Sequence, residues 1–240
     1  MELNYLYMKS YRISAMIVGV LYIIGTISGI LSIVVTGDLL KGNDVLTKIA
    51  MNPIPLNWGS FFILIMGLSL AAMPVFLYPI FKKKNEALAL GLVVFRGPIE
   101  GSAYMLFVVN WLLLGAYSQE VFAIGGETAS LRTMGNVFLQ ANQLMKPVLS
   151  IVFIIGAMFL YTLFYQTQLI PCWLSIWGII GALFYLIAAI VKFFNIGFGF
   201  SIDFLYAPLA IQEMVMAFWL IVKGFNQKYL TNMVVEKSHT

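Results

Sequence analysis

Six long runs of predominantly apolar residues dominate this 240-residue sequence and leave few options for its fold. A helix that crosses a bilayer needs about 20 consecutive apolar residues. The runs cover residues 13–36, 57–81, 87–117, 147–165, 172–194 and 204–222. Charged residues make up only 10% of the chain, against about 25% in soluble domains. We therefore expect an all-α polytopic membrane protein, a compact bundle of six transmembrane helices that forms one membrane domain over residues 1–240.

The lysines and arginines between the runs predict the orientation of this bundle. Cytoplasmic segments carry an excess of such residues, and an N terminus on the cytoplasmic side places eight inside and five outside. The inner set is Lys9, Arg12, Lys82, Lys83, Lys84, Lys223, Lys228 and Lys237, and the outer set is Lys41, Lys48, Arg132, Lys146 and Lys192. We expect both termini in the cytoplasm. The net charge of +4 then reflects topology, and no nucleic-acid partner is expected.

Residues 128–146, in the outer connection before the fourth run, show the pattern of an amphipathic helix. Apolar residues recur there at helical spacing, while Arg132, Asn136 and Gln140 fall on another side. Thr128 is a suitable N-cap residue for this helix. Three interpretations remain open. The helix lies on the outer membrane surface, it extends the fourth transmembrane helix, or it covers a cavity between helices.

Three ionisable residues fall inside the predicted hydrocarbon core, namely Arg96, Glu100 and Glu213. An ionisable group at this depth is costly and suggests a functional site. Arg96 and Glu100 are four residues apart, so they share one helical face. Arg96 follows Glu86 by ten residues and Glu213 precedes Lys223 by ten, so both lie about 15 Å from the cytoplasmic boundary. We expect Arg96 and Glu213 to be neighbours, with Glu100 one turn away.

Two interpretations of this charged group remain open. One arginine between two ionised carboxylates leaves a net charge of −1, which favours a site for a small molecule, an ion or a proton. Alternatively, the charges form a structural clamp that fixes how the helices pack. Tyr104 follows on the same helical face, Gln212 adjoins Glu213, and Pro98 predicts a kink between the first two charges. The candidate ligand-binding residues are Arg96, Glu100, Tyr104, Gln212 and Glu213.

The sequence offers few residues for catalysis or metal binding. It contains one cysteine, Cys172, and one histidine, His239, close to the C-terminal end. A serine or cysteine nucleophile that needs a histidine base therefore lacks one, and a zinc site needs several such ligands. We expect no disulfide, catalytic residue, metal or cofactor, and the sequence does not predict an enzyme.

Three stretches of the chain resemble a bacterial membrane family catalogued as domain of unknown function 4386. They are Phe95-Arg96 with Glu100, the segment 170–178 (IPCWLSIWG), and Glu213 followed by 219–224 (WLIVKG). The resemblance covers most of the chain and implies a compact six-helix bundle in the bacterial cytoplasmic membrane. It supplies no activity, substrate or cofactor.

Two functions from different classes fit these observations. The first is a multi-pass membrane protein that binds, and in one version transports, a small molecule or ion at the Arg96, Glu100 and Glu213 centre. The second is a structural or regulatory membrane protein in which that centre is only a helix clamp and the function lies in a partner. A six-helix bundle leaves little room for alternating access unless the chain forms a homo-oligomer. The expected partners are therefore the lipid bilayer, a small-molecule or ion ligand and a second copy of the chain.

Overall fold

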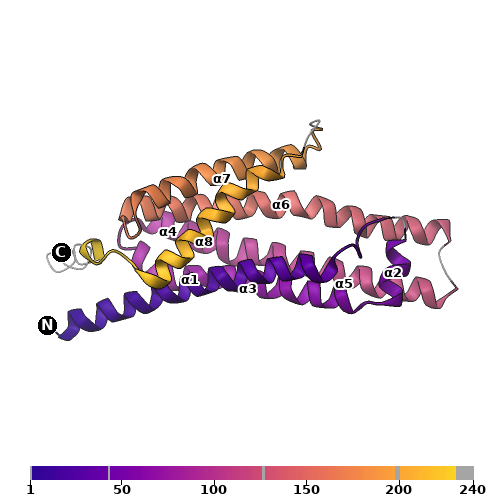
Figure 1. Ribbon diagram of the computed structural model, residues 1–240, viewed down its shortest axis with the longest axis horizontal. Helices are drawn as coiled ribbons and strands as arrows, with labels where there is room; N and C mark the ends of the chain where they lie inside the picture. Colours follow the sequence, from indigo (N-terminus) through magenta and orange to yellow (C-terminus); the bar gives the residue numbers. More distant parts are fainter. Residues whose placement is uncertain (1, 43, 126–127, 198–200, 231–240) are drawn as a thin grey trace.

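The chain folds into a bundle of long helices, seen in a computed structural model that describes residues 2–42, 44–125, 128–197 and 201–230 (Figure 1). Lys237 and His239 lie outside this part of the chain. The elements are α1 (Glu2–Thr36), α2 (Val45–Met51), α3 (Ile54–Phe81), α4 (Glu86–Val94), η1 (Phe95–Ile99), α5 (Glu100–Ala123), α6 (Ala129–Thr167), α7 (Cys172–Phe193), η2 (Asp203–Tyr206) and α8 (Ala207–Val222).

Within the described residues, six stretches of helix are long and apolar enough to cross a membrane. They are Lys9–Thr36, Ile54–Phe81, Glu86–Ala123, Ala129–Thr167, Cys172–Phe193 and Asp203–Val222. The predicted fold class, an all-α polytopic bundle with six membrane-spanning helices, is confirmed. The protein is therefore a multi-pass membrane protein. The third of these stretches combines α4, η1 and α5, because the helix continues through a π-helical turn at residues 95–99.

The amphipathic segment 128–146 is the first half of α6, which runs without a break to Thr167. Of the three interpretations, the structure has the one in which this segment extends the fourth transmembrane helix. Neighbouring helices cover part of this segment: Gly135 lies against the side chain of Leu46 in α2, and Phe138 and Met145 pack against the buried core, whereas Met134 is exposed. Asn110 of α5 also donates a hydrogen bond to the backbone oxygen of Phe138 at 3.2 Å, which joins the two long helices.

Figure 1 shows that α1, α3, α5 and α6 run along one long axis, whereas α8 lies oblique to it and the short α2 crosses it. The N terminus and the end of α8 lie at one end of the bundle, called here the terminal end. The connection between α7 and α8 lies at the opposite end, called here the loop end. At this end, α2 and the ends of α5 and α6 extend further along the long axis than α7 and α8 do. The α7 helix packs on α6, and α8 packs on both α1 and α7.

Polar contacts fix α8 to α1 at the terminal end. Arg12 donates hydrogen bonds to the backbone oxygens of Leu220 at 3.3 Å, Ile221 at 2.7 Å and Val222 at 3.0 Å. These carbonyls lie in the last turn of α8 and have no partner within the helix, and a cation is favourable at this end of the helix dipole. The end of α8 at the terminal end of the bundle is therefore held by Arg12 of α1.

The charged side chains between the end of α1 and α2 form ion pairs with one another. Lys41 pairs with Asp38 at 2.7 Å, and Lys48 pairs with Asp44 at 2.8 Å. The hydrogen bond from each lysine lowers the pKa of its aspartate below the usual value. All four side chains are solvent-exposed, so these aspartates belong to the surface of the loop end.

Helices α1 and α8 meet closely at Gly19. A Cβ atom at this position would lie 2.7 Å from the backbone oxygen of Ala217 and 2.7 Å from Cγ1 of Ile221. Such distances are too short for real atoms, so the two helices can touch only because residue 19 has no side chain. Small residues commonly permit close helix packing in membranes.

We predict that Gly19→Ala lowers the stability of the purified protein by about 1–3 kcal/mol, the usual cost of overpacking. The measurement is the thermal unfolding temperature in detergent. Gly101→Ala is the matched control, because a Cβ atom there would make only an ordinary contact of 3.5 Å with Ala71. Alanine is the better helix former, so this control should be neutral or stabilising. Equal stability of the two variants would contradict the prediction.

Candidate functional site

The π-helical turn at Phe95–Ile99 places Arg96 in the centre of the bundle. Pro98 lies within this turn, and a proline inside an α-helix removes one hydrogen bond and clashes with the preceding turn. A π turn is a common local solution and often marks a functional site. Arg96 is 1% exposed. Gly156 of α6 leaves room for it, because a Cβ atom there would lie 3.2 Å from Cδ of Arg96.

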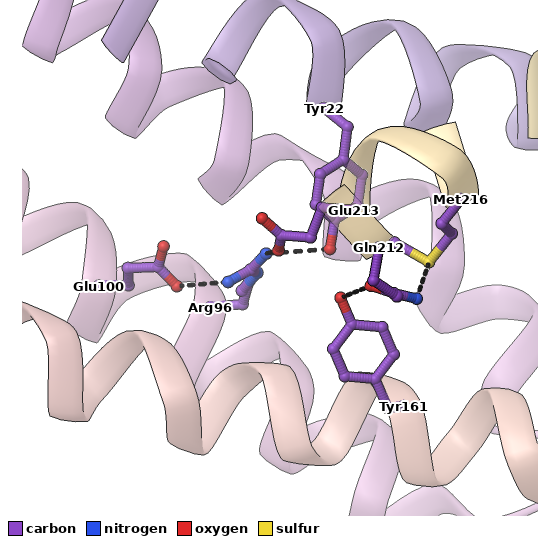
Figure 2. A network of polar contacts seen from close by, with 7 residues as sticks. All are labelled: Tyr22, Arg96, Glu100, Tyr161, Gln212, Glu213 and Met216. Carbon is purple, nitrogen blue, oxygen red and sulfur yellow. Dashed lines mark hydrogen bonds and ion pairs between the residues drawn. The ribbon is translucent and has the colours of Figure 1, made fainter. Parts of the chain in front are cut away.

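The guanidinium group of Arg96 contacts three polar side chains (Figure 2). Its Nη1 atom lies 3.4 Å from Oε2 of Glu100. Its Nη2 atom donates a hydrogen bond to the Tyr22 hydroxyl at 3.0 Å and lies 3.6 Å from Oε1 of Glu213. The predicted proximity of Arg96 to both glutamates is therefore present in the structure. We call Arg96, Glu100 and Glu213 the charged triad.

Two aromatic rings also lie close to the guanidinium. Cζ of Arg96 is 4.7 Å from the centroid of the Phe153 ring and 5.7 Å from the centroid of the Tyr22 ring. A cation within about 6 Å of a ring face is attracted to it, most strongly in the absence of water. The partners of Arg96 therefore come from α1, α5, α6 and α8.

Three polar atoms of the charged triad are buried and have no hydrogen-bond partner among the described residues. They are Nε of Arg96, Oε1 of Glu100 and Oε1 of Glu213. The ion pairs account for part of the attraction, but each of these atoms has unused hydrogen-bonding capacity. If both glutamates are ionised, the triad carries a net charge of −1. The charge balance of the triad is then incomplete, and burial of such an uncompensated charge costs several kcal/mol.

Gln212 lies next to Glu213 on α8, and its side chain bonds to two other helices. Its Oε1 atom accepts a hydrogen bond from the Tyr161 hydroxyl at 2.7 Å, and its Nε2 atom donates to the backbone oxygen of Leu174 at 3.0 Å. Gly178 of α7 leaves space for the Tyr161 ring. These bonds position α8 against α6 and α7, and they direct the Gln212 amide away from Arg96 (Figure 2).

Tyr104 is buried beside the triad, on the side that faces α3. Its Cβ atom lies against Gly67, where an added methyl group would be only 2.6 Å away. Tyr104 also lines a surface crevice of about 130 Å³ between α3 and the η1–α5 segment. The crevice is lined by Leu64, Gly67, Leu68, Ala71, Gly97, Pro98, Gly101, Ser102, Tyr104 and Met105. None of the triad residues lines this crevice.

Two contacts of the triad were not found from the sequence. Tyr22 and Phe153 are single aromatic residues within apolar runs, a pattern that is common in membrane helices. Tyr22 could have been found from its expected depth in the membrane. It follows Arg12 by ten residues, and Glu213 precedes Lys223 by ten, so both fall at the same distance from the basic residue at that end of their helix. Phe153 carries no comparable signal. Within the described ranges, no group of three or more His, Cys, Asp and Glu residues could hold a metal ion.

We predict that Arg96→Met destabilises the detergent-solubilised protein by about 3–5 kcal/mol, because it leaves the buried carboxylate of Glu100 without its partner. The double variant Arg96→Met/Glu100→Gln should be more stable than Arg96→Met alone, since it removes that charge. The measurement is the free energy of unfolding in denaturant. Arg132→Met is the control at an exposed arginine. A double variant as unstable as the sum of its two single variants would exclude the coupling.

The comparison with known proteins gives one family. The model of the family described as Domain of unknown function (DUF4386) matches residues 17–224. This range includes the three triad residues and both Tyr22 and Gln212. No curated protein and no solved structure matches the chain. Since the match covers most of the sequence, the chain belongs to the DUF4386 family of domains of unknown function.

Proposed function

We propose that this membrane protein binds a proton at the charged triad and that Glu213 is the residue that takes it. The observation that carries the proposal is the arrangement of two buried carboxylates around one guanidinium. A helix clamp needs only one carboxylate for each arginine. The second carboxylate adds a negative charge that the described neighbours leave uncompensated.

A proton removes this excess charge at the lowest structural cost. Transfer of an isolated carboxylate into a medium of low dielectric constant is so unfavourable that the group neutralises instead. With one proton bound, the triad consists of a neutral acid and an Arg–Glu ion pair, and its net charge is zero. The protonated carboxyl group also gains one O–H donor.

The geometry favours Glu213 over Glu100 as the acceptor of the proton. Glu100 is 1% exposed in its side chain and lies 3.4 Å from Arg96, within hydrogen-bonding distance. Glu213 is 14% exposed and lies 3.6 Å from Arg96, and its Oε1 atom has no hydrogen bond. Glu100 is thus the better counter-ion, while Glu213 is more weakly held by Arg96 and less enclosed by the chain.

A proton also fits the site better than a larger ligand does. The crevice beside Tyr104 does not include the triad residues among its lining. A metal cation needs several oxygen ligands and would be repelled by Arg96. A proton requires neither a cavity nor a coordination shell.

The second candidate function, a structural clamp with the function in a partner, is favoured by one observation. The contacts of Arg96 join α1, α5, α6 and α8, which is the arrangement expected of a residue that fixes helix packing. The two candidates differ in charge state. A clamp without a bound proton keeps both glutamates ionised, whereas a proton site holds one of them as a neutral acid.

Infrared spectroscopy of the full chain distinguishes these states. We predict a carbonyl-stretch band of a protonated carboxylic acid at neutral pH, shifted in D₂O and lost in Glu213→Gln. The same substitution should have little effect on stability, since glutamine resembles the neutral acid in size and charge. Glu120→Gln, at an exposed glutamate of α5, is the control that should keep the band.

Three other results of this experiment would contradict the proposal. The absence of the band in the parent protein would favour the clamp. The absence of the band together with a thermal stability that depends on Na⁺ or K⁺ would indicate a metal cation as the ligand. Loss of the band in Glu100→Gln and its retention in Glu213→Gln would move the proton to Glu100.

A further inference from the structure

Basic side chains at the two ends of the bundle differ in their partners. At the loop end, Lys41, Lys48 and Lys192 each form an ion pair with an aspartate. At the terminal end, no basic side chain pairs with a carboxylate among the residues that the structure describes. The basic residues there are Lys9, Arg12, Lys82, Lys83, Lys84, Lys223 and Lys228, and we call them the basic rim.

The basic rim has an excess of positive charge that orientation alone does not explain. Of the carboxylates whose side chains the structure describes, Glu86 at the start of α4 lies at this end, and it is exposed. A bias in lysine and arginine sets the orientation of a membrane protein, but it does not require these residues to lack counter-ions. A surface with this imbalance is complementary to an anion.

Two neighbouring residues of α1 hold separate parts of the basic rim together. The Tyr11 hydroxyl accepts a hydrogen bond at 2.6 Å from Nζ of Lys83, in the connection between α3 and α4. Arg12 bonds to the last carbonyls of α8, and a Cβ atom at Gly224 would lie only 2.5 Å from its Nη1 atom. The α3–α4 connection and the segment around Lys223 therefore both contact the same turn of α1.

The members of the basic rim divide into two groups. Arg12 and Lys83 are half-buried and take part in packing through the contacts just described. The other five are exposed, and their ammonium groups make no hydrogen bond to the described part of the chain. They are Lys9, Lys82, Lys84, Lys223 and Lys228. The packing contacts thus fix the backbone from which the exposed lysines extend.

The basic rim lies at the level expected for lipid headgroups. Tyrosine and tryptophan are enriched at the boundary between membrane and water. Tyr78, Tyr165 and Trp173 lie next to the connections at the terminal end, and the last two are 48% and 53% exposed. Lys82 follows Tyr78 by one turn, with its Nζ atom 5.4 Å from the centroid of the Tyr78 ring. The lysines therefore extend just beyond the aromatic residues, where the lipid phosphates are.

We propose that the basic rim binds the headgroups of anionic phospholipids, with Lys82, Lys84 and Lys223 as the principal contacts. Each ammonium group has three hydrogen-bond donors, and phosphate oxygens accept such bonds. Basic residues close to a membrane surface are attracted to anionic lipids. The acyl chains of a lipid hold its phosphate at this level, whereas a soluble phosphate has to be bound from dilute solution. The inference goes beyond the proton site and does not depend on it, because the basic rim contains no residue of the charged triad.

A pair of matched triple variants tests this inference. The rim variant is Lys82→Gln/Lys84→Gln/Lys223→Gln, and the loop variant is Lys41→Gln/Lys48→Gln/Lys192→Gln. Both remove three positive charges from the full chain, so their net charges are equal. Each protein is purified in detergent with equal amounts of dioleoylphosphatidylglycerol and dioleoylphosphatidylcholine, which differ only in the headgroup. Native mass spectrometry then counts the molecules of each lipid that remain bound.

The expected result is a preference of the parent protein for phosphatidylglycerol, which the loop variant keeps and the rim variant loses. One lysine near an anionic surface strengthens binding by about fivefold, so the rim variant should lose at least about tenfold. A higher salt concentration should weaken the preference of the parent, because salt screens exposed charges. Unfolding temperatures measured with phosphatidylcholine alone should be similar for the three proteins, since the substituted lysines are exposed or half-buried. If the rim variant unfolds earlier, Lys84→Gln replaces it, with an expected loss of about fivefold.

Three results would overturn the inference. Without a preference in the parent, the basic rim does not select anionic lipids. Equal losses in the two triple variants would mean that the preference follows the net charge of the protein and not the basic rim. Displacement of phosphatidylglycerol by an equal concentration of glycerol 1-phosphate would mean that the lysines bind a soluble phosphate and not a lipid.

Discussion

The burial of one positive charge, that of Arg96, is the constraint on which the centre of this protein depends. The membrane interior offers no water to a guanidinium group, so every part of its solvation must come from the chain itself. The structure supplies it from four directions, with Tyr22, Glu100 and Glu213 at the nitrogen atoms and Phe153 against the face. Positions of α1, α5, α6 and α8 are therefore linked through a single side chain.

The backbone around Arg96 is adapted to the same constraint. The π turn at residues 95–99 accommodates Pro98 within a continuous transmembrane helix. Gly156 on the facing helix has no side chain, so the aliphatic part of Arg96 can lie against α6. The local irregularity and the missing side chain thus have the same consequence, which is that a long charged residue fits into a closely packed bundle.

The sequence predicted the bundle and the triad because both follow from simple periodic rules. The length of apolar runs gives the transmembrane helices, and a separation of four residues places Arg96 and Glu100 on one face. Equal depth then paired Arg96 with Glu213. The remaining contacts depend on how helices rotate about their axes, which no local pattern specifies. Phe153 therefore could not be predicted.

The same limit explains the two candidate residues that lie beside the triad. Adjacent residues of a helix point in directions about 100° apart, so Gln212 cannot share the direction of Glu213, and it bonds to Tyr161 and Leu174 instead. Tyr104 is on the expected face of α5, but its ring packs towards α3 at Gly67.

The amphipathic pattern of residues 128–146 was ambiguous for a related reason. The pattern indicates that one face is covered, but it does not show whether lipid or α2 and α5 cover it.

Gln212 and Glu213 are adjacent on α8, but Gln212 bonds to α6 and α7 while Glu213 pairs with Arg96. A change in the charge of Glu213 therefore leaves the bonds of Gln212 unaffected. A proton on Glu213 removes its attraction to Arg96, which acts over 3.6 Å, and leaves the Arg96–Glu100 pair neutral. The bonds of Gln212 to α6 and α7 and those of Arg12 to the end of α8 involve no carboxylate. They therefore persist in both charge states. Because α8 is held independently of the triad, the gain or loss of a proton at Glu213 is expected to alter the charge of the centre while the helix stays in place.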